Sequence, residues 1–299
     1  MFQSINTAQK SNIEIGITGS NTAAMPAKTF ELLRKYIYEN CGIYFQDNKK
    51  YLLESRLQKR INYLGLGSFD EYYSFINDAV KGFLEKKYLY EAITINETFF
   101  FRNQPQFDAL INTIFPDIIQ RKKANNQKKI KIWSAASSTG EEGYTIAMLI
   151  KDIVKPKNPD FEFEIVGTDI NNAVVDTAKR GVYKEYSIRQ TPPYYLKKYF
   201  KRVDNTFELS PDIVNMVNFK VMNLYDDFAM KTMFNFDVIM CANVLIYFDT
   251  ESKIKVVSQL YDALNTGGYL FIGYSETLHG ISKAFKLISF PKTIGYKKE

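Results

Sequence analysis

Residues 132–144 read IWSAASSTGEEGY, and this stretch decides the fold. A buried-strand pattern over residues 131–135 runs into a turn of small residues, and a helix is predicted to follow over residues 140–152. Small residues let the backbone approach a ligand closely. The stretch therefore predicts a nucleotide-binding turn between a first strand and the helix that follows it.

The pattern of alternating strands and helices continues along the chain. A second strand, predicted over residues 161–168, runs into Asp169, and an acidic residue at that strand end can accept both hydroxyls of a ribose. Further elements are predicted as a helix at 172–179, a strand at 236–241, a helix at 250–264 and a strand at 268–273. Such alternation implies a parallel sheet with helices on both faces.

The charge of the turn narrows the class of ligand. A dinucleotide needs its pyrophosphate at the helix N-terminus, where this chain carries Glu141 and Glu142. Two carboxylates repel a pyrophosphate but suit the ammonium and sulfonium groups of S-adenosylmethionine. The alternative is that the two glutamates only favour the helix macrodipole. A nicotinamide dehydrogenase is the least favoured interpretation.

The first hundred residues have a different composition from the rest. Residues 1–27 are rich in Ser, Asn, Thr and Ala, and we predict a mobile tail. A helical pattern follows, with Thr29 as the predicted cap of the first helix and Ser68 as the cap of the third. We divide the chain into an all-helical domain at 28–97 and an α/β domain at 98–299, with a small β insertion at 183–224 where the alternation lapses.

A basic cluster marks the second predicted helix, at residues 49–64. Arg56, Lys59 and Arg60 share one face at spacings of three and four, different from the apolar face. Such a cluster is typical of a solvated helix face, but it also suits an acidic partner. The net charge of +6 is mild and does not establish a nucleic-acid binder.

Composition excludes several classes of protein. The chain has 299 residues, of which 45% are hydrophobic and 24% charged, as expected of a globular protein. No apolar run reaches the roughly 18 residues that cross a bilayer. Cys41, Cys241 and His279 form neither a disulfide framework nor a zinc site, so we expect no metal and a cytoplasmic location.

Four segments together resemble the CheR family of methyltransferases. They are TINETFFFR at 94–102, WSAASSTGEE at 133–142, FDVIMCANVLIYFD at 236–249 and GYLFIGYSE at 268–276. The similarity spans roughly residues 28–296. It implies a class I, Rossmann-like methyltransferase with a mixed sheet, helices on both faces and a small β insertion, preceded by an all-helical domain.

The resemblance also implies an activity. Family members transfer a methyl group from S-adenosylmethionine to glutamate side chains of methyl-accepting chemotaxis proteins, leaving S-adenosylhomocysteine. The implied partners are the cytoplasmic helices of these receptors, with no nucleic acid and no membrane insertion, and we expect a monomer. In some members the β subdomain grips a tail peptide of the receptor by adding a strand.

Particular residues carry this resemblance. The implied catalytic residues are Arg102 and Tyr247, and the implied substrate-binding residues are Arg56, Lys59 and Arg60. The implied cofactor residues are Asn96, Thr98, Arg102, Ala136, Glu141, Glu142, Asp169, Asn223, Leu224, Asn243 and Val244. Two positions depart from the family pattern, because Ala242 stands where the family usually has Arg and Gly143 where it has Pro.

Two other functions share the same cofactor site. One is a methyltransferase that acts on RNA or a small molecule. The other is a non-catalytic module that senses S-adenosylmethionine or S-adenosylhomocysteine, which the missing arginine at Ala242 keeps open. The sequence Thr191-Pro192-Pro193-Tyr194 is similar to a motif of adenine methyltransferases, but that motif follows the fourth strand, and here the prolines lie in the insertion.

Overall fold

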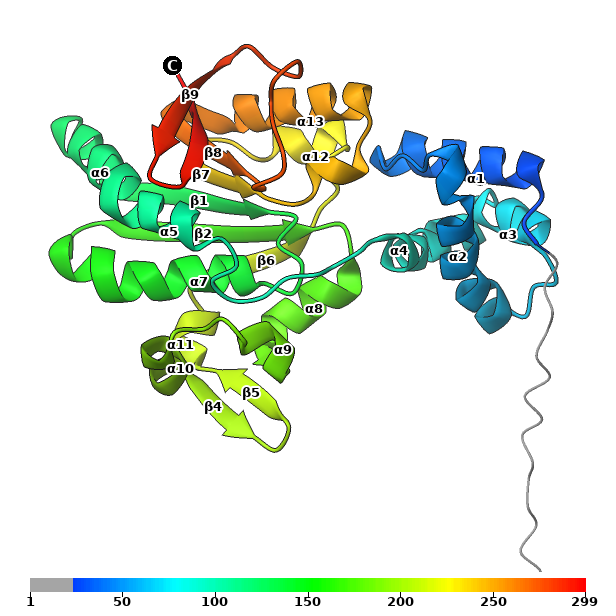
Figure 1. Cartoon of the computed structure of the whole chain (residues 1–299), viewed down its shortest axis with the longest axis horizontal. Coiled ribbons are helices and arrows are strands. Elements are labelled where there is room, and N and C mark those ends of the chain that lie inside the picture. The colour runs from blue at the N-terminus through cyan, green and yellow to red at the C-terminus, as the bar shows by residue number, and fades with distance from the viewer. Residues whose placement is uncertain (1–23) are drawn as a thin grey trace, which may run out of the picture.

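The structure, a computed structural model, describes residues 24–299 and consists of a helical part and an α/β part joined by an extended linker (Figure 1). The helical part contains α1 (Ala27–Cys41), α2 (Lys50–Leu64), α3 (Phe69–Ile76) and α4 (Lys81–Ile93). Leu53, Leu57 and Ile61 of α2 are buried in its core. The periodic apolar face predicted for this helix is therefore confirmed.

The start of the helical part differs from the prediction. Most of the predicted tail, residues 1–23, lies outside the described residues, but Met25 is buried and α1 already begins at Ala27. Pro26, not Thr29, occupies the cap position, and the buried Thr29 hydroxyl donates a hydrogen bond to Asp70 instead. Ser68 caps α3 as predicted, since its hydroxyl oxygen accepts the N–H of Glu71.

A seven-stranded mixed sheet forms the centre of the α/β part. Its strands are β1 (Lys129–Ala135), β2 (Glu162–Asp169), β6 (Val217–Val221), β7 (Phe236–Cys241), β8 (Leu264–Ile272), β9 (Phe285–Phe290) and β10 (Thr293–Lys298). Their order is β6-β2-β1-β7-β8-β10-β9, and only β10 runs antiparallel to its neighbours. The strands predicted from alternation are present, but the β9–β10 hairpin was not anticipated.

Helices cover both faces of the sheet because successive strand residues point to opposite sides. Ile132 packs into one core with α7 (Glu141–Leu149) and α8 (Asn172–Arg180). Its neighbour Trp133 packs into the other with α13 (Thr250–Ala263). The helices α5 (Gln104–Ala109) and α6 (Phe115–Ala124) pack into the same core as Ile132, and α12 (Asp227–Lys231) packs into the same core as Trp133. The predicted layer arrangement is confirmed.

A second, three-stranded sheet stands apart from the first (Figure 1). It contains β3 (Val182–Tyr183), β4 (Phe200–Val203) and β5 (Thr206–Leu209), with the short helices α9 (Glu185–Ile188), α10 (Pro193–Tyr199) and α11 (Pro211–Val214). The β insertion exists, but its predicted end at residue 224 is wrong. Residues 219–221 belong to β6, because that strand pairs with β2 at the edge of the main sheet.

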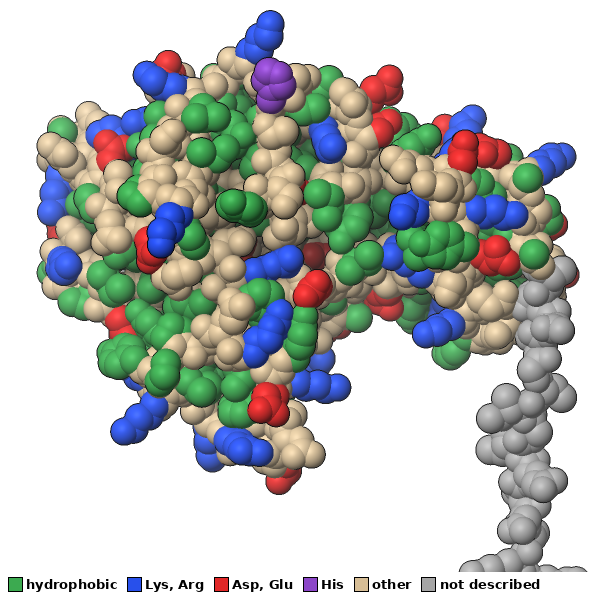
Figure 2. All heavy atoms as spheres, in the orientation of Figure 1, with side chains coloured by type: hydrophobic (Ala, Val, Ile, Leu, Met, Phe, Trp, Pro, Cys, Tyr) green, Lys and Arg blue, Asp and Glu red, His purple; other side chains and the backbone are tan. Residues whose placement is uncertain are grey.

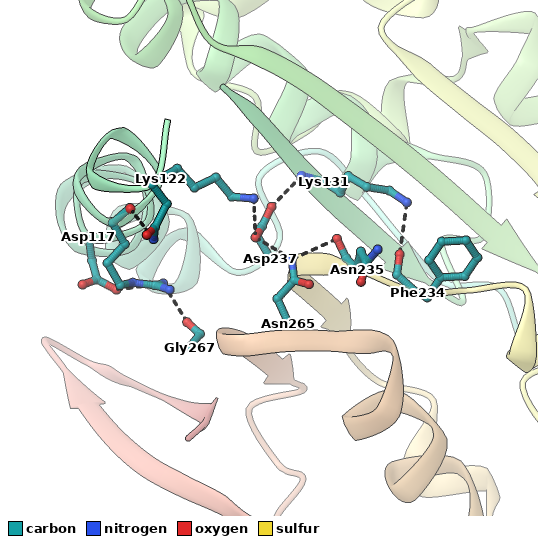
Figure 3. A network of polar contacts seen from close by, with 10 residues as sticks. Asp117, Lys122, Lys131, Phe234, Asn235, Asp237, Asn265 and Gly267 are labelled. Atoms are coloured by element: carbon teal, nitrogen blue, oxygen red, sulfur yellow. Dashed lines mark hydrogen bonds and ion pairs between the residues drawn. The ribbon is translucent and has the colours of Figure 1, made fainter. Parts of the chain in front are cut away.

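A buried ion pair ties α6 to the amino ends of the strands (Figure 3). The Lys122 Nζ atom lies 2.9 Å from Asp237 Oδ1, and both side chains are largely buried. The same carboxylate accepts the backbone N–H of Lys131 and the side-chain amide of Asn265, each at 2.9 Å.

No described helix is long and apolar enough to span a membrane.

Replacing Asp237 by Ala should lower the free energy of unfolding by about 3–5 kcal/mol, because it leaves Lys122 charged and buried without a partner. Urea denaturation measures this loss. The control is Asp160→Ala, which removes an exposed partner of Lys128 and should change stability by about 1 kcal/mol or less. Equal losses in the two variants would contradict the importance of the buried pair.

Candidate functional site

A cavity opens at the carboxyl ends of β1, β2 and β7. Here the strand order changes direction, because β2 lies on one side of β1 and β7 on the other. This is the position at which open α/β sheets bind their ligands. The cavity is lined by Cys41, Ile43, Ile93–Phe99, Arg102, Asn103, Phe107, Ala136–Ser138, Glu142, Asp169, Ile170, Met222–Leu224, Ala242–Val244, Tyr247 and Phe248. The linker between the two parts therefore forms one wall, and the strand ends form the other.

The turn after β1 has a constrained backbone. Ala136 and Ser138 have φ angles of 56° and 49°, in the left-handed region that residues other than glycine rarely adopt. Gly140 precedes α7 with φ of 93°, and a Cβ atom there would lie 2.8 Å from the Phe219 ring. Unusual backbone angles concentrate at functional sites, and here they turn the Ala136–Ser138 segment toward the cavity.

Only one of the two glutamates of the turn faces the cavity. Glu142 lines it, whereas Glu141 is fully buried elsewhere and accepts a hydrogen bond from the Thr139 hydroxyl at 2.6 Å. Consecutive side chains of a helix point about 100° apart, so Glu141 and Glu142 cannot both face the cavity. The prediction that Glu141 touches the cofactor is therefore wrong.

Among the residues that the structure describes, Glu142 is one of three acidic residues that line the cavity, with Glu97 and Asp169. Burial raises the pKa of Glu142 from 4.5 to about 7, against the opposing effects of its hydrogen bond from Ser134 and of the Arg102 charge. The Ser134 hydroxyl donates to it at 2.7 Å and fixes its position. A buried carboxylate of this kind gains most from a cationic ligand, which restores the stabilisation that it loses on leaving water.

Asp169 ends β2 at the opposite wall. Its carboxylate accepts the backbone N–H of Ser138 at 2.9 Å and that of Asn171 at 3.0 Å. Burial raises the pKa of Asp169, and these two N–H groups oppose the rise. Asp169 lines the cavity, and a carboxylate oxygen can accept more than one hydrogen bond, so the two oxygens suit the two hydroxyls of a ribose.

An apolar slot lies beside Asp169. It is formed by Ile170, Met222 and Leu224, all of which line the cavity. The Asn223 side chain is fixed across the two parts, since its amide donates to the carbonyl of Asn40 at 2.7 Å. The slot suits a flat aromatic ring such as adenine, with Asn223 and Leu224 beside it.

The loop after β7 is held by a carboxylate that the sequence analysis did not single out. Glu276 is buried and accepts backbone N–H groups from Gly273 at 2.6 Å, Asn243 at 3.0 Å and Ile246 at 3.1 Å. It thereby fixes Asn243, which has φ of 62°, and the turn that carries Tyr247. Glu276 lies in the GYSE sequence at 273–276, but nothing in the sequence shows which N–H groups it binds.

Replacing Glu276 by Gln should lower kcat/KM by about 10- to 100-fold, because an amide NH2 group cannot accept the N–H groups that the carboxylate accepts. Steady-state kinetics and thermal unfolding, measured together, separate loss of loop geometry from loss of folding. The control is Glu208→Gln on the exposed surface of β5, which should behave as wild type. A Glu276→Gln enzyme with unchanged kinetics would show that the loop holds its geometry without this carboxylate.

The linker places Arg102 at the edge of the cavity. Its guanidinium donates to the Glu97 carbonyl at 2.6 Å and lies 5.5 Å from the centre of the Phe99 ring. Tyr247 stands nearby, and burial raises the pKa of its hydroxyl while the charges of Arg56 and Arg102 oppose the rise. Two arginines, one from α2 and one from the linker, therefore approach the same tyrosine.

The helical part closes the cavity, which the sequence did not predict. Cys41, Ile43 and Ile93 contribute to its lining. The Tyr44 N–H donates to the Tyr247 carbonyl at 3.0 Å, and Ile43 forms an isolated antiparallel bridge with Phe248. These contacts join residues about 200 positions apart, so no local pattern in the sequence could indicate them.

The structure brings most of the predicted residues together at the cavity. Asn96, Thr98, Arg102, Ala136, Glu142, Asp169, Asn223, Leu224, Asn243, Val244 and Tyr247 all line the cavity, and Glu141 does not. Arg56 reaches its edge, where its guanidinium donates to the carbonyl of Ile93. Lys59 is exposed on α2. Arg60 is paired with the buried Glu85 at 2.5 Å, so the structure does not support the predicted substrate-binding role of Arg60.

The donor set fits one cofactor. A carboxylate for an ammonium, a strand-end carboxylate for a ribose and an apolar slot for adenine match S-adenosylmethionine, whereas a pyrophosphate would meet Glu142. The strand order and this site define a class I methyltransferase that uses S-adenosylmethionine. The chain belongs to the CheR methyltransferase family. It matches the family's SAM-binding domain over residues 96–294 and its all-alpha domain over residues 28–94.

Named relatives agree with this assignment. The chain is 36% identical to the chemotaxis protein methyltransferase of Borreliella burgdorferi over 92% of its own length and 95% of that protein. It is 35% identical to chemotaxis protein methyltransferase 2 of Vibrio cholerae, covering 89% and 91% of the two chains. Chemotaxis protein methyltransferase 1 of Pseudomonas aeruginosa is 34% identical, with coverage of 90% and 97%.

Proposed function

We propose that the enzyme methylates glutamate side chains of methyl-accepting chemotaxis receptors and produces glutamyl methyl esters. The names of the relatives support a role in chemotaxis, and the chemistry of the cavity supports a carboxylate acceptor. Of the residues that line the cavity, all of them in the described part of the chain, none is a histidine or a lysine. A glutamate acceptor is already ionised at neutral pH and needs no general base, so Glu142 and Asp169 remain free to hold the donor.

The observation that carries the proposal is that Arg102 and Tyr247 line one cavity, while Arg56 is bound at its edge to the carbonyl of Ile93. Arg102 lines the cavity and Arg56 approaches it from α2, where both charges act on the Tyr247 hydroxyl. An arginine fork binds a carboxylate through paired, charge-assisted hydrogen bonds. Arg56 also offers a positive charge at a site where Ala242 replaces the arginine that the family usually has.

The chain's own residues bind and orient the two reactants. S-adenosylmethionine, when bound, supplies an electrophilic methyl group. Glu142 and Asp169 hold the two ends of the donor, and Arg102 orients the acceptor carboxylate for in-line attack. The linker and the helical part exclude water from the cavity, which removes the hydration shell that otherwise stabilises a carboxylate. Tyr247 can donate a hydrogen bond to either reactant.

We further propose a division of labour between the two parts. Residues 98–299 hold the donor, and residues 28–97 approach the receptor through Arg56 and Lys59 of α2. The exposed Lys59 side chain and the half-buried Arg56 suit an acidic helix, and electrostatic attraction of this kind accelerates association. Residue Arg60 takes no part in this proposal, because Glu85 already neutralises it.

Incubation with labelled S-adenosylmethionine tests the choice of acceptor. Membranes rich in the organism's chemotaxis receptors and total RNA are offered in parallel, and label is expected in the receptor fraction alone. Reversal of Arg56 and Lys59 to glutamate should reduce that labelling at low salt. Label in RNA would favour the rival methyltransferase, and binding of the cofactor without any transfer would favour the sensing module.

A further inference from the structure

An exposed apolar surface covers one side of α4 and the end of α2. We name it the α4 ledge and define it by Tyr63, Val80, Phe83, Leu84 and Tyr88. Phe83 is 80% exposed, Leu84 61% and Tyr63 79%. Phe83 and Leu84 lie three and four residues after Val80, the N-cap of α4, and Tyr88 lies four after Leu84, so the four share one face, while the other face buries Leu89 and Ile93.

The α4 ledge is bordered by positive charge. The Arg60 guanidinium lies 4.0 Å from the ring centre of Tyr88 on α4 and 4.7 Å from that of Tyr63 on α2. The arginine therefore bridges the two helices. Lys87 lies 4.6 Å from the Tyr88 ring, and Lys59 is exposed one turn before Tyr63. Figure 2 shows hydrophobic and basic side chains next to one another over the helical part. Exposed apolar groups collected in this way mark an interaction surface.

Two contacts fix the position of the α4 ledge relative to the cavity. Arg56 donates to the carbonyl of Ile93, and Arg60, one turn further along α2, binds Glu85. The two helices are therefore antiparallel. Ile93, at the end of α4, lines the cavity, and Phe83 lies near the opposite end of the same helix. The ten residues between Ile93 and Phe83 span about 15 Å at 1.5 Å per residue.

We propose that the α4 ledge is a second contact for the receptor helix whose glutamate is methylated. This inference rests on the proposed function. A helix that places its acceptor glutamate beside Tyr247 and runs along α4 reaches the ledge about ten residues, or three turns, from that glutamate. The receptor helix therefore carries an apolar side chain at about that distance, flanked by acidic residues.

Charge and geometry favour this occupant over others. In a two-fold dimer the ledge would meet its own copy, and Lys59 and Lys87 would face the same cations. An anionic lipid surface would satisfy the charges but would not use the alignment of α4 with the cavity. An acidic helix satisfies both, because a single segment then contacts the methyl-transfer site and the ledge.

The test compares two substrates and one double variant. Phe83→Gln with Leu84→Gln removes the apolar groups and keeps good helix formers, while Phe228→Gln is the control, since Phe228 is 84% exposed on α12. The long substrate is a receptor cytoplasmic fragment, and the short one is a peptide that ends about five residues from the same glutamate, too short to reach Phe83 and Leu84.

The double variant should raise KM for the long fragment about tenfold, because two partly buried side chains together contribute about that factor in affinity. Its kcat and its KM for the short peptide should remain within twofold of wild type. Phe228→Gln should match wild type on both. Equal KM values for the double variant and the control would overturn the proposal.

Two parallel measurements identify the other occupants. A wild-type mass in sedimentation twice that of the double variant, with unchanged KM, would assign the α4 ledge to self-association. Binding to anionic vesicles that is lost in the variant, again with unchanged KM, would assign it to a lipid surface. Either result overturns the proposal while receptor methylation itself persists. A wild-type enzyme that labels no receptor would instead refute the proposed function, and the ledge's role with it.

Discussion

Replacing Arg102 by lysine should lower turnover on the receptor by about a hundredfold or more, although the charge is kept. A lysine is a point charge and cannot hold a carboxylate through two parallel hydrogen bonds. Loss of one well-placed donor in an active site reduces the rate by about 100- to 1000-fold. Single-turnover kinetics with saturating S-adenosylmethionine measure the effect on the transfer step itself.

The cofactor affinity and the stability of the Arg102→Lys enzyme distinguish catalysis from structure. Both should remain close to wild type, because Arg102 sits at the edge of the cavity and donates there to the carbonyl of Glu97, an acceptor that a lysine can also reach. Arg180→Lys, at the exposed end of α8, is the matched control. Turnover near wild type, together with reduced stability, would show that Arg102 is a structural residue.

Replacing Glu142 by Gln should weaken binding of S-adenosylhomocysteine by about 10- to 100-fold at pH 8, since a charged hydrogen bond to the ammonium contributes about 1.5–3 kcal/mol. Because burial raises the pKa of Glu142 to about 7, the wild-type carboxyl is largely neutral at pH 6 and ionised at pH 8. Wild-type affinity should therefore rise about tenfold between these pH values, while the variant shows little change. Isothermal titration calorimetry across the range measures both.

The same shift predicts the opposite trend for stability without ligand. The folded protein keeps a proton on Glu142 that the unfolded chain releases above pH 4.5, so the free energy of unfolding should fall between about pH 4.5 and 7. Glu142→Gln should remove this part of the decline. An affinity for S-adenosylhomocysteine that is independent of pH in the wild type would contradict the assignment of Glu142 to the ammonium.

The sequence predicted those parts of the fold that depend on local pattern. The strand at 236–241 and the helix after Asp249 agree with β7 and α13, because buried strands and capped helices leave a periodic signature. The β9–β10 hairpin was missed, since its strands alternate weakly and lie at the edge of the sheet. β6 was assigned to the insertion because a five-residue strand does not reveal its partner.

The site was predictable where one turn or one strand end defines it. Asp169 and Glu142 follow from the position of a carboxylate after a strand, and the family resemblance added Arg102 and Tyr247. Glu141 was misplaced because the sequence gives two adjacent carboxylates without the direction of either. The ion pair of Arg60 was missed for a related reason, since its partner Glu85 lies 25 residues away on another helix.

The chemistry of the transferred methyl group tests the central claim most directly. Receptor labelled with the methyl of S-adenosylmethionine is treated with mild alkali, and volatile methanol is collected. Attack by a glutamate oxygen yields an ester, so nearly all of the label should leave as methanol. Label that stays on the protein after alkali would place the methyl on nitrogen, and the account of a carboxylate acceptor held by Arg56 and Arg102 would be wrong.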